Sequence, residues 1–215
     1  MRRNGSQSLL PMRFWAILFV PTLFLLSVPI QTKAATINIV AFGTSNIYGK
    51  GVERGEDFPA KLELALRAKG YDTHVSNAGI NGDTSIGMLR RVNTAVPDVT
   101  QIAIVEPGYN DIKRGEPGSG RITSAAETRA NFDAIVKNLR SRNIQVLLIG
   151  RRGLELASVA QTHDALFFDE FRYGTGNNPA YLTATRDHLN AAGYDIVVAN
   201  LLPLVESLIT RVLGK

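Results

Sequence analysis

Three short segments, far apart in the sequence, contain residue types that could together catalyse acyl transfer. Ser45 follows one apolar run, Asn110 follows another, and His188 precedes the last helical stretch. Nucleophilic acyl transfer needs a hydroxyl, a base for its proton, and neutral donors that face the developing oxyanion. Serine, histidine and asparagine can fill these three roles in turn. The combination predicts a hydrolase of the esterase type.

Ser45 by itself would be weak evidence, because serines commonly cap helices or fill strand–helix turns. The glycines of residues 43–55 also suggest nucleotide binding, but they miss the spacing of a P-loop and of a dinucleotide fingerprint by one residue each. The Gly-x-Ser-x-Gly turn of α/β-hydrolases is absent. A nucleotide-binding module is therefore a distant alternative.

The segments that must position these residues alternate between apolar runs and helical patterns. This alternation indicates a three-layer α/β fold, in which a parallel sheet has helices on both faces. Ligands of such folds bind beyond the carboxyl ends of the strands, where the three segments should lie. Asn190 is expected to cap a last helix, and Pro203 is expected to kink or divide it. The expected strands are 36–42, 73–76, 101–106, 145–149 and 165–168, and the other expected helices are 58–69, 85–96, 124–140 and 154–164.

The first 34 residues have the pattern of a secretory signal peptide. Three arginines stand at positions 2, 3 and 13, residues 14–28 are mostly apolar, and residues 32–34 offer small residues for cleavage after Ala34. An uncleaved membrane anchor is the weaker alternative, since the run is short and contains a proline. We expect a periplasmic or secreted protein in which residues 35–215 form a single domain, without a stable membrane anchor after cleavage.

The charge and composition of the chain exclude several functional classes. The formal net charge is +5, but four of these charges lie in the first 34 residues, so the rest is nearly neutral and no nucleic-acid partner is expected. Cysteine is absent, which excludes disulfides, thiolate metal sites and cysteine nucleophiles. No cluster of His, Asp and Glu has metal-ligand spacing, so no metal or other cofactor is expected. Oligomeric state leaves no signature in the sequence.

Two blocks make the interpretation more specific. Residues 77–85 read Asn-Ala-Gly-Ile-Asn-Gly-Asp-Thr-Ser, and residues 105–115 read Val-Glu-Pro-Gly-Tyr-Asn-Asp-Ile-Lys-Arg-Gly. Both resemble the SGNH (GDSL-type) hydrolases, and most of all the bacterial exported group of thioesterases, lysophospholipases and arylesterases. The resemblance runs from about residue 37 to 115 and resumes at residues 188–190.

This resemblance implies a flavodoxin-like three-layer fold and a role for each of four residues. Ser45 would be the nucleophile and His188 the base. Gly82, through its backbone N–H, and Asn110, through its side-chain amide, would form an oxyanion hole together with the N–H of Ser45. Elementary chemistry agrees, since glycine lets the backbone approach a substrate carbonyl and asparagine offers a neutral donor.

Two positions depart from the family pattern. Thr44 stands where the family usually has aspartate, and Thr185 stands where an aspartate would orient the histidine. Because such a carboxylate stabilises the imidazolium, its absence leaves open a non-catalytic binding protein on the same fold.

Other carboxylates could replace the missing one. Asp187 directly precedes His188, and neighbouring side chains seldom converge, so a simple substitution is not expected. Asp164, Asp169 or a backbone carbonyl remain alternatives, and a Ser–His dyad is the working hypothesis. Arg151 and Arg152 are expected to be solvated surface, and His74 and His163 are expected to be structural.

The sequence thus predicts an exported hydrolase of small carboxylic esters or thioesters. A carbohydrate O-acetyl esterase is the alternative that shares the chemistry and differs in substrate.

Overall fold

A computed structural model describes residues 35–111 and 123–214 of the chain. These residues belong to one compact unit. The expected signal peptide lies outside the described residues.

A five-stranded parallel sheet forms the centre of this unit, with strand order β2-β1-β3-β4-β5. Helices follow the strands in sequence, as in other parallel sheets, where each crossover needs a long connection. The strands are β1 (Ile37–Gly43), β2 (Thr73–Gly79), β3 (Ile102–Val105), β4 (Gln145–Ile149) and β5 (Leu166–Phe168). The helices are α1 (Ser45–Tyr48), α2 (Phe58–Ala68), α3 (Ser85–Ala95), α4 (Ala125–Ser141), α5 (Leu156–Thr162), the 3₁₀ helix η1 (Pro179–Tyr181) and α6 (Ala191–Leu213).

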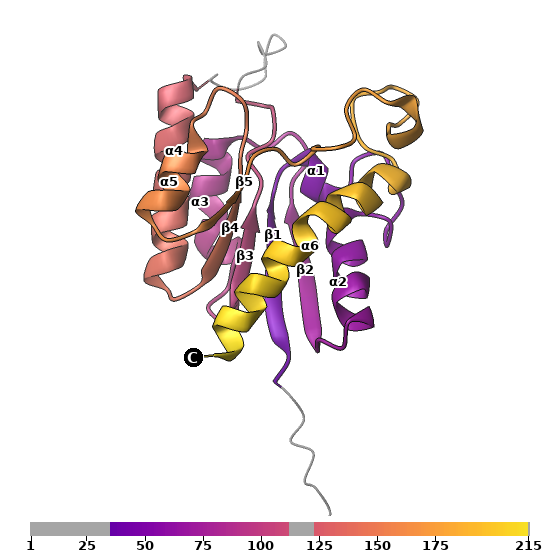
Figure 1. The fold of residues 1–215 in the computed structure, drawn as a ribbon. Coiled ribbons are helices and arrows are strands. Elements are labelled where there is room, and N and C mark those ends of the chain that lie inside the picture. Colours follow the sequence, from indigo (N-terminus) through magenta and orange to yellow (C-terminus); the bar gives the residue numbers. More distant parts are fainter. Residues whose placement is uncertain (1–34, 112–122, 215) are drawn as a thin grey trace, which may run out of the picture. The chain divides into compact units, whose positions relative to one another are not determined.

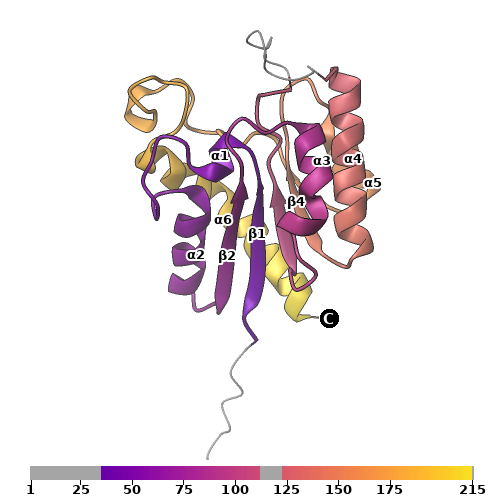
Figure 2. The same cartoon turned by 180° about the vertical axis from the view of Figure 1, so that it is seen from behind.

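Helices cover both faces of the sheet, which confirms the predicted three-layer α/β fold. Helices α2 and α6 lie on one face, and α3, α4 and α5 lie on the other (Figures 1 and 2). Successive residues of β1 alternate between the two cores: Ile39 packs with α2 and α6, whereas Val40 packs with α3 and α4. Both sides of the strand are therefore buried, which explains its continuous apolar run.

The last helix confirms its expected cap and excludes one of the two outcomes expected of Pro203. The side chain of Asn190 accepts a hydrogen bond from the N–H of Gly193 and caps α6, as predicted. Pro203 does not divide the helix, which continues to Leu213. Pro203 and Ala199, four residues earlier, are both exposed, so water can satisfy the carbonyl that loses its partner.

Helix α6 is long and apolar enough to span a membrane by composition, with a mean hydropathy of 1.8. One side of it is nevertheless core, because Val197, Leu201 and Leu208 are fully buried against the sheet and α2. Packing thus accounts for the apolar residues on the buried side of α6.

The carboxyl ends of β1, β2 and β3 lie side by side, since Phe42 pairs with both Ala78 and Val105. The segments that contain Ser45, Gly82 and Asn110 leave the sheet at this edge. The fold therefore brings three of the predicted site segments to one place.

Candidate active site

Ser45 lies at the start of α1, immediately beyond the end of β1. Two glycines permit this placement. A Cβ on Gly43 would collide with Ile47 of α1, and a Cβ on Gly79 would collide with the backbone of Tyr48. The absence of these side chains lets α1 sit directly on the sheet edge.

His188 contacts Ser45, although the two residues are 143 positions apart in the sequence. Its Nε2 lies 2.9 Å from the Ser45 Oγ, and the imidazole is nearly buried at 8% exposure. The turn before it is held by hydrogen bonds from the N–H of Arg186 to the Thr183 carbonyl and from the N–H of Thr183 to the His188 carbonyl, both 2.9 Å. His188 is therefore held by a short loop with its own backbone hydrogen bonds.

Asp187 faces the other nitrogen of the same ring. Its Oδ2 lies 3.0 Å from the His188 Nδ1, so the expectation that adjacent side chains would not converge is wrong here. Hydrogen bonds from Thr185 above all, and then from His188 and Thr183, lower the pKa of Asp187 well below its ordinary value. This carboxylate is thus ionised at neutral pH.

The other two aspartates that were considered lie elsewhere. Asp164 forms an ion pair with Arg140 at 2.9 Å, and Asp169 lines a different cavity together with Arg152 and Tyr173. Neither lines the cavity that contains His188. Thr185, which replaces the family aspartate, instead donates a hydrogen bond to Asp187.

Gly82 and Asn110 line the same cavity as Ser45 and His188, which has a volume of about 460 Å³. Gly82 has φ of +80°, a conformation that favours glycine. The amide of Asn110 donates one hydrogen bond, of 2.7 Å, to the carbonyl of Asp83. An amide nitrogen has two hydrogens, and the second has no acceptor among residues 35–111 and 123–214, so it can serve as a donor to a ligand.

Asp111 anchors the Asn110 segment to its neighbours through its side chain. The carboxylate is buried and accepts hydrogen bonds from the N–H and the hydroxyl of Ser85 and from the hydroxyl of Thr123. The loop after β3 is thereby tied to the start of α3.

Sequence reasoning missed the buried carboxylate of Glu106, which is 2% exposed. Its Oε2 accepts bonds from the N–H and the hydroxyl of Thr44, each 3.2 Å, and its Oε1 accepts bonds from Asn46 Nδ2 and the Gly108 N–H, each 2.9 Å. Burial raises its pKa, and these bonds oppose that rise. Glu106 therefore joins the Ser45 turn to the Asn110 loop, and Thr44 acts as one of its donors.

Arg91 of α3 was also missed, and it makes a comparable connection. Its guanidinium donates to the Asp83 carboxylate at 2.7 Å and to the carbonyls of Ala78 and Gly43 at 2.8 and 2.9 Å. It also lies over the Phe42 ring, 4.5 Å from the centroid. One side chain thus holds the ends of β1 and β2 and the loop that contains Gly82.

The expectation of solvated surface is wrong for Arg151. Its guanidinium stacks 3.6 Å from the centroid of the Tyr109 ring and donates to the Gly108 carbonyl, while Arg152 is exposed. The sequence held no signal for this contact. The other two histidines have structural contacts, His74 with Ser76 and His163 with Asp133.

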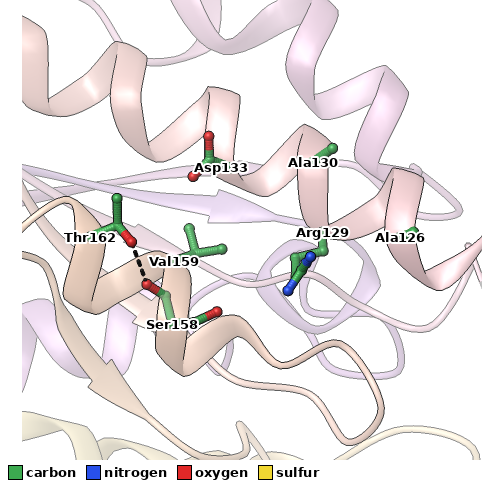
Figure 3. Close-up of a pocket in the computed structure, with 7 residues that line it drawn as sticks. All are labelled: Ala126, Arg129, Ala130, Asp133, Ser158, Val159 and Thr162. Carbon is green, nitrogen blue, oxygen red and sulfur yellow. Dashed lines mark hydrogen bonds between the residues drawn. The ribbon is translucent and has the colours of Figure 1, made fainter.

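A separate cavity of about 350 Å³ lies between α4 and α5. Figure 3 shows Arg129, Asp133 and Ser158 among its lining side chains, and Thr162 bonded to the Ser158 carbonyl. It contains no serine–histidine pair. Among residues 35–111 and 123–214, no group of three His, Asp or Glu could hold a metal ion.

Comparison with known proteins assigns the family. The GDSL-like Lipase/Acylhydrolase family pattern matches residues 41–196. Esterase TesA of Pseudomonas aeruginosa is 30% identical over 119 residues, which are 55% of this chain and 56% of that protein. The aligned region thus spans about half the length of this curated relative.

Solved structures extend the similarity over most of the chain. A crystal structure of TesA matches 80% of this chain and 99% of its own, with 25% identity and a TM-score of 0.71. AlinE4, described as an SGNH-hydrolase family esterase, matches 82% of this chain and 98% of its own, with 31% identity and a TM-score of 0.64. The chain belongs to the GDSL-like lipase/acylhydrolase family, the SGNH hydrolases.

Proposed function

We propose that this protein is an exported serine hydrolase of carboxylic esters or thioesters. The observation that carries the proposal is the 2.9 Å contact between Ser45 Oγ and His188 Nε2, in a cavity that Gly82 and Asn110 also line. A hydroxyl, a base and neutral donors within one cavity are the parts that acyl transfer requires.

In the acylation step, Ser45 Oγ attacks the carbonyl carbon while His188 Nε2 takes its proton. The carbonyl oxygen becomes an oxyanion, which accepts hydrogen bonds from the N–H groups of Ser45 and Gly82 and from the Asn110 amide. Asp187 stabilises the imidazolium through Nδ1. The tetrahedral intermediate collapses as His188 protonates the leaving oxygen or sulfur, and the acyl group stays on Ser45.

In the deacylation step, water attacks the acyl-enzyme and gives its proton to His188. The same three donors hold the second oxyanion. His188 then returns the proton to Ser45 Oγ as the acid leaves, which restores the starting state. The chain's own residues perform every proton transfer.

The cavity lining favours a short, polar acyl substrate. Of the described residues that line it, none has an aliphatic side chain, and Tyr109 supplies the aromatic surface. The other apolar atoms of the lining belong to polar and charged residues, so no slot of aliphatic side chains is present to hold a long alkyl chain by hydrophobic contact. The same observation supports a second candidate substrate, an acetyl ester of a carbohydrate.

Hydrolysis of p-nitrophenyl acetate and butyrate tests the proposal. The wild type should release nitrophenol and react with a fluorophosphonate at Ser45, and S45A should lose both activities. A matched control is S158A, because Ser158 lines the separate cavity between α4 and α5. Turnover that persists in S45A would refute the mechanism, whereas ligand binding with no labelling of Ser45 would indicate a non-catalytic binding protein.

Export is proposed from residues 1–34 and has its own test. Protein recovered from the periplasm or the medium of a bacterial host should begin at Ala35. A full-length amino terminus in the membrane fraction would indicate the uncleaved anchor instead.

A further inference from the structure

The active-site cavity has an uneven distribution of charge. Its described lining includes Lys50, Arg172 and Arg186 but only one acidic residue, Asp187. The rest of the chain after residue 34 is almost neutral, so this concentration of positive charge is local. Clefts lined by charge of one sign raise the local concentration of oppositely charged ligands.

One of the three cationic side chains already has an ion-pair partner. Lys50 Nζ lies 3.4 Å from the Asp187 carboxylate. Neither Arg172 nor Arg186 has an ion-pair partner within the part of the chain that the structure describes. Two guanidinium groups therefore border the cavity with no carboxylate of the described residues at ion-pair distance.

The structure holds the backbone of Arg186 in a demanding conformation. Its φ is +59°, which costs energy in a residue with a side chain. It occupies the turn closed by the bond from its N–H to the Thr183 carbonyl, two residues before His188. The turn that positions the His188 imidazole therefore also positions the backbone of Arg186, from which the cationic side chain extends.

Arg172 approaches from a separate segment, the loop between β5 and η1. It is partly buried, and its Nη2 reaches the Gly176 carbonyl at 3.5 Å. Guanidinium groups bind carboxylates and phosphates through two parallel hydrogen bonds. Two of them, on different loops beside one nucleophile, fit an anionic group better than an alkyl chain.

We propose that Arg172 and Arg186 select esters that bear a carboxylate or phosphate close to the scissile bond. This inference rests on the proposed function, because it concerns the substrate of the same serine. The acyl group transfers to Ser45 as described above, and the arginines contact the charged group without taking part in proton transfer.

Three para-substituted phenyl acetates test this selectivity. Para-acetoxybenzoate carries a carboxylate, para-acetoxybenzamide is its uncharged isostere, and para-acetoxyphenyl phosphate carries a phosphate. Each kcat/KM is divided by the spontaneous hydrolysis rate to correct for leaving-group reactivity. At low ionic strength, at least one anion should exceed the amide by about tenfold, since each exposed ion pair gives about a two- to fivefold effect. The preferred anion identifies the charged group as carboxylate or phosphate.

Substitutions of the two arginines then assign the preference. R172Q and R186Q should each lower the anion-to-amide ratio about two- to fivefold, through KM rather than kcat, and R186K should restore most of it. Added salt should reduce the wild-type ratio, because screening weakens exposed charge pairs. R152Q is the matched control, since Arg152 lines a different cavity.

Three outcomes of this experiment would contradict a proposal, and they have two different meanings. A wild type that hydrolyses the amide and both anions equally well would overturn the selectivity and leave the esterase proposal intact. A ratio that R152Q lowers as much as R186Q would also overturn it. A wild type that hydrolyses none of the three would contradict the proposed function itself.

Discussion

The carboxylate of Asp187 lies 3.0 Å from Nδ1 of His188, the residue that directly follows it. Adjacent side chains point to opposite faces of a strand and diverge on a helix. This segment is neither, because Arg186 has a left-handed conformation with φ of +59° and the turn that begins at Thr183 reverses the chain. The local turn brings the two side chains together. Asp187 is thereby the partner of the His188 imidazole, a role that the family pattern gives to an aspartate at position 185.

Replacing this partner should slow catalysis. D187N keeps the size of the side chain but removes the charge that stabilises the imidazolium. Loss of the corresponding group in a serine protease costs roughly 10⁴ in rate, and we expect kcat for p-nitrophenyl acetate to fall by about 10³ to 10⁴. D164N is the matched control, since Asp164 pairs with Arg140 and its substitution should leave kcat unchanged. A D187N enzyme with wild-type kcat would establish a dyad.

Removal of the Asn110 amide should weaken oxyanion stabilisation. N110A deletes a donor whose loss typically costs about 3 kcal/mol of transition-state stabilisation, or roughly 10²-fold in kcat. The value of KM should change little, because the oxyanion exists only after attack. N93A, at an exposed position of α3, is the control. A rise in KM with unchanged kcat would assign Asn110 to substrate binding instead.

Substitution of Arg91 should destabilise the segments that position the active site. R91K retains the charge, but a lysine cannot form the three directed bonds to Asp83, Ala78 and Gly43. Losing bonds to a charged donor should destabilise the fold by about 2 kcal/mol, or roughly 4–8 °C in Tm for a domain of this size. The kcat should fall as well, because the Gly82 loop loses its support. The neighbouring exposed Arg90 gives the control R90K, and equal Tm values for the two variants would contradict the prediction.

The buried Glu106 should leave a signature in the pH dependence of stability. Its folded pKa is raised above the ordinary 4.5, so the unfolded chain releases this proton at lower pH than the folded chain does. The free energy of unfolding should therefore fall as pH rises through the interval above 4.5, by at most about 1.4 kcal/mol per pH unit.

E106Q should abolish this contribution, and urea unfolding of both proteins between mildly acidic and neutral pH measures the difference. The variant should also be less stable by about 1–3 kcal/mol, because its amide NH₂ faces N–H donors. If the wild type gained stability relative to E106Q as pH increased, the assigned direction would be wrong.

Much of the fold could be predicted from local pattern. Apolar runs that alternate with helical periodicity require a sheet buried on both faces. Asn190 marks the start of the last helix, because its side chain can cap the first turn. Ser45, Gly82, Asn110 and His188 could be selected because the blocks around them are distinctive. Such features depend on residues close together in sequence, where type and spacing are sufficient information.

Only the tertiary structure decided which side chains meet across long separations. Thr44 donates to Glu106, Arg91 reaches the end of β1, and Arg151 stacks on Tyr109, and none of these contacts follows from spacing. The partner of His188 depended on a left-handed turn at Arg186, which no residue preference at that position would indicate. Contacts of this kind depend on the directions in which loops leave the sheet and on the free-energy cost of burying unpaired charge. Both are defined only in the folded chain.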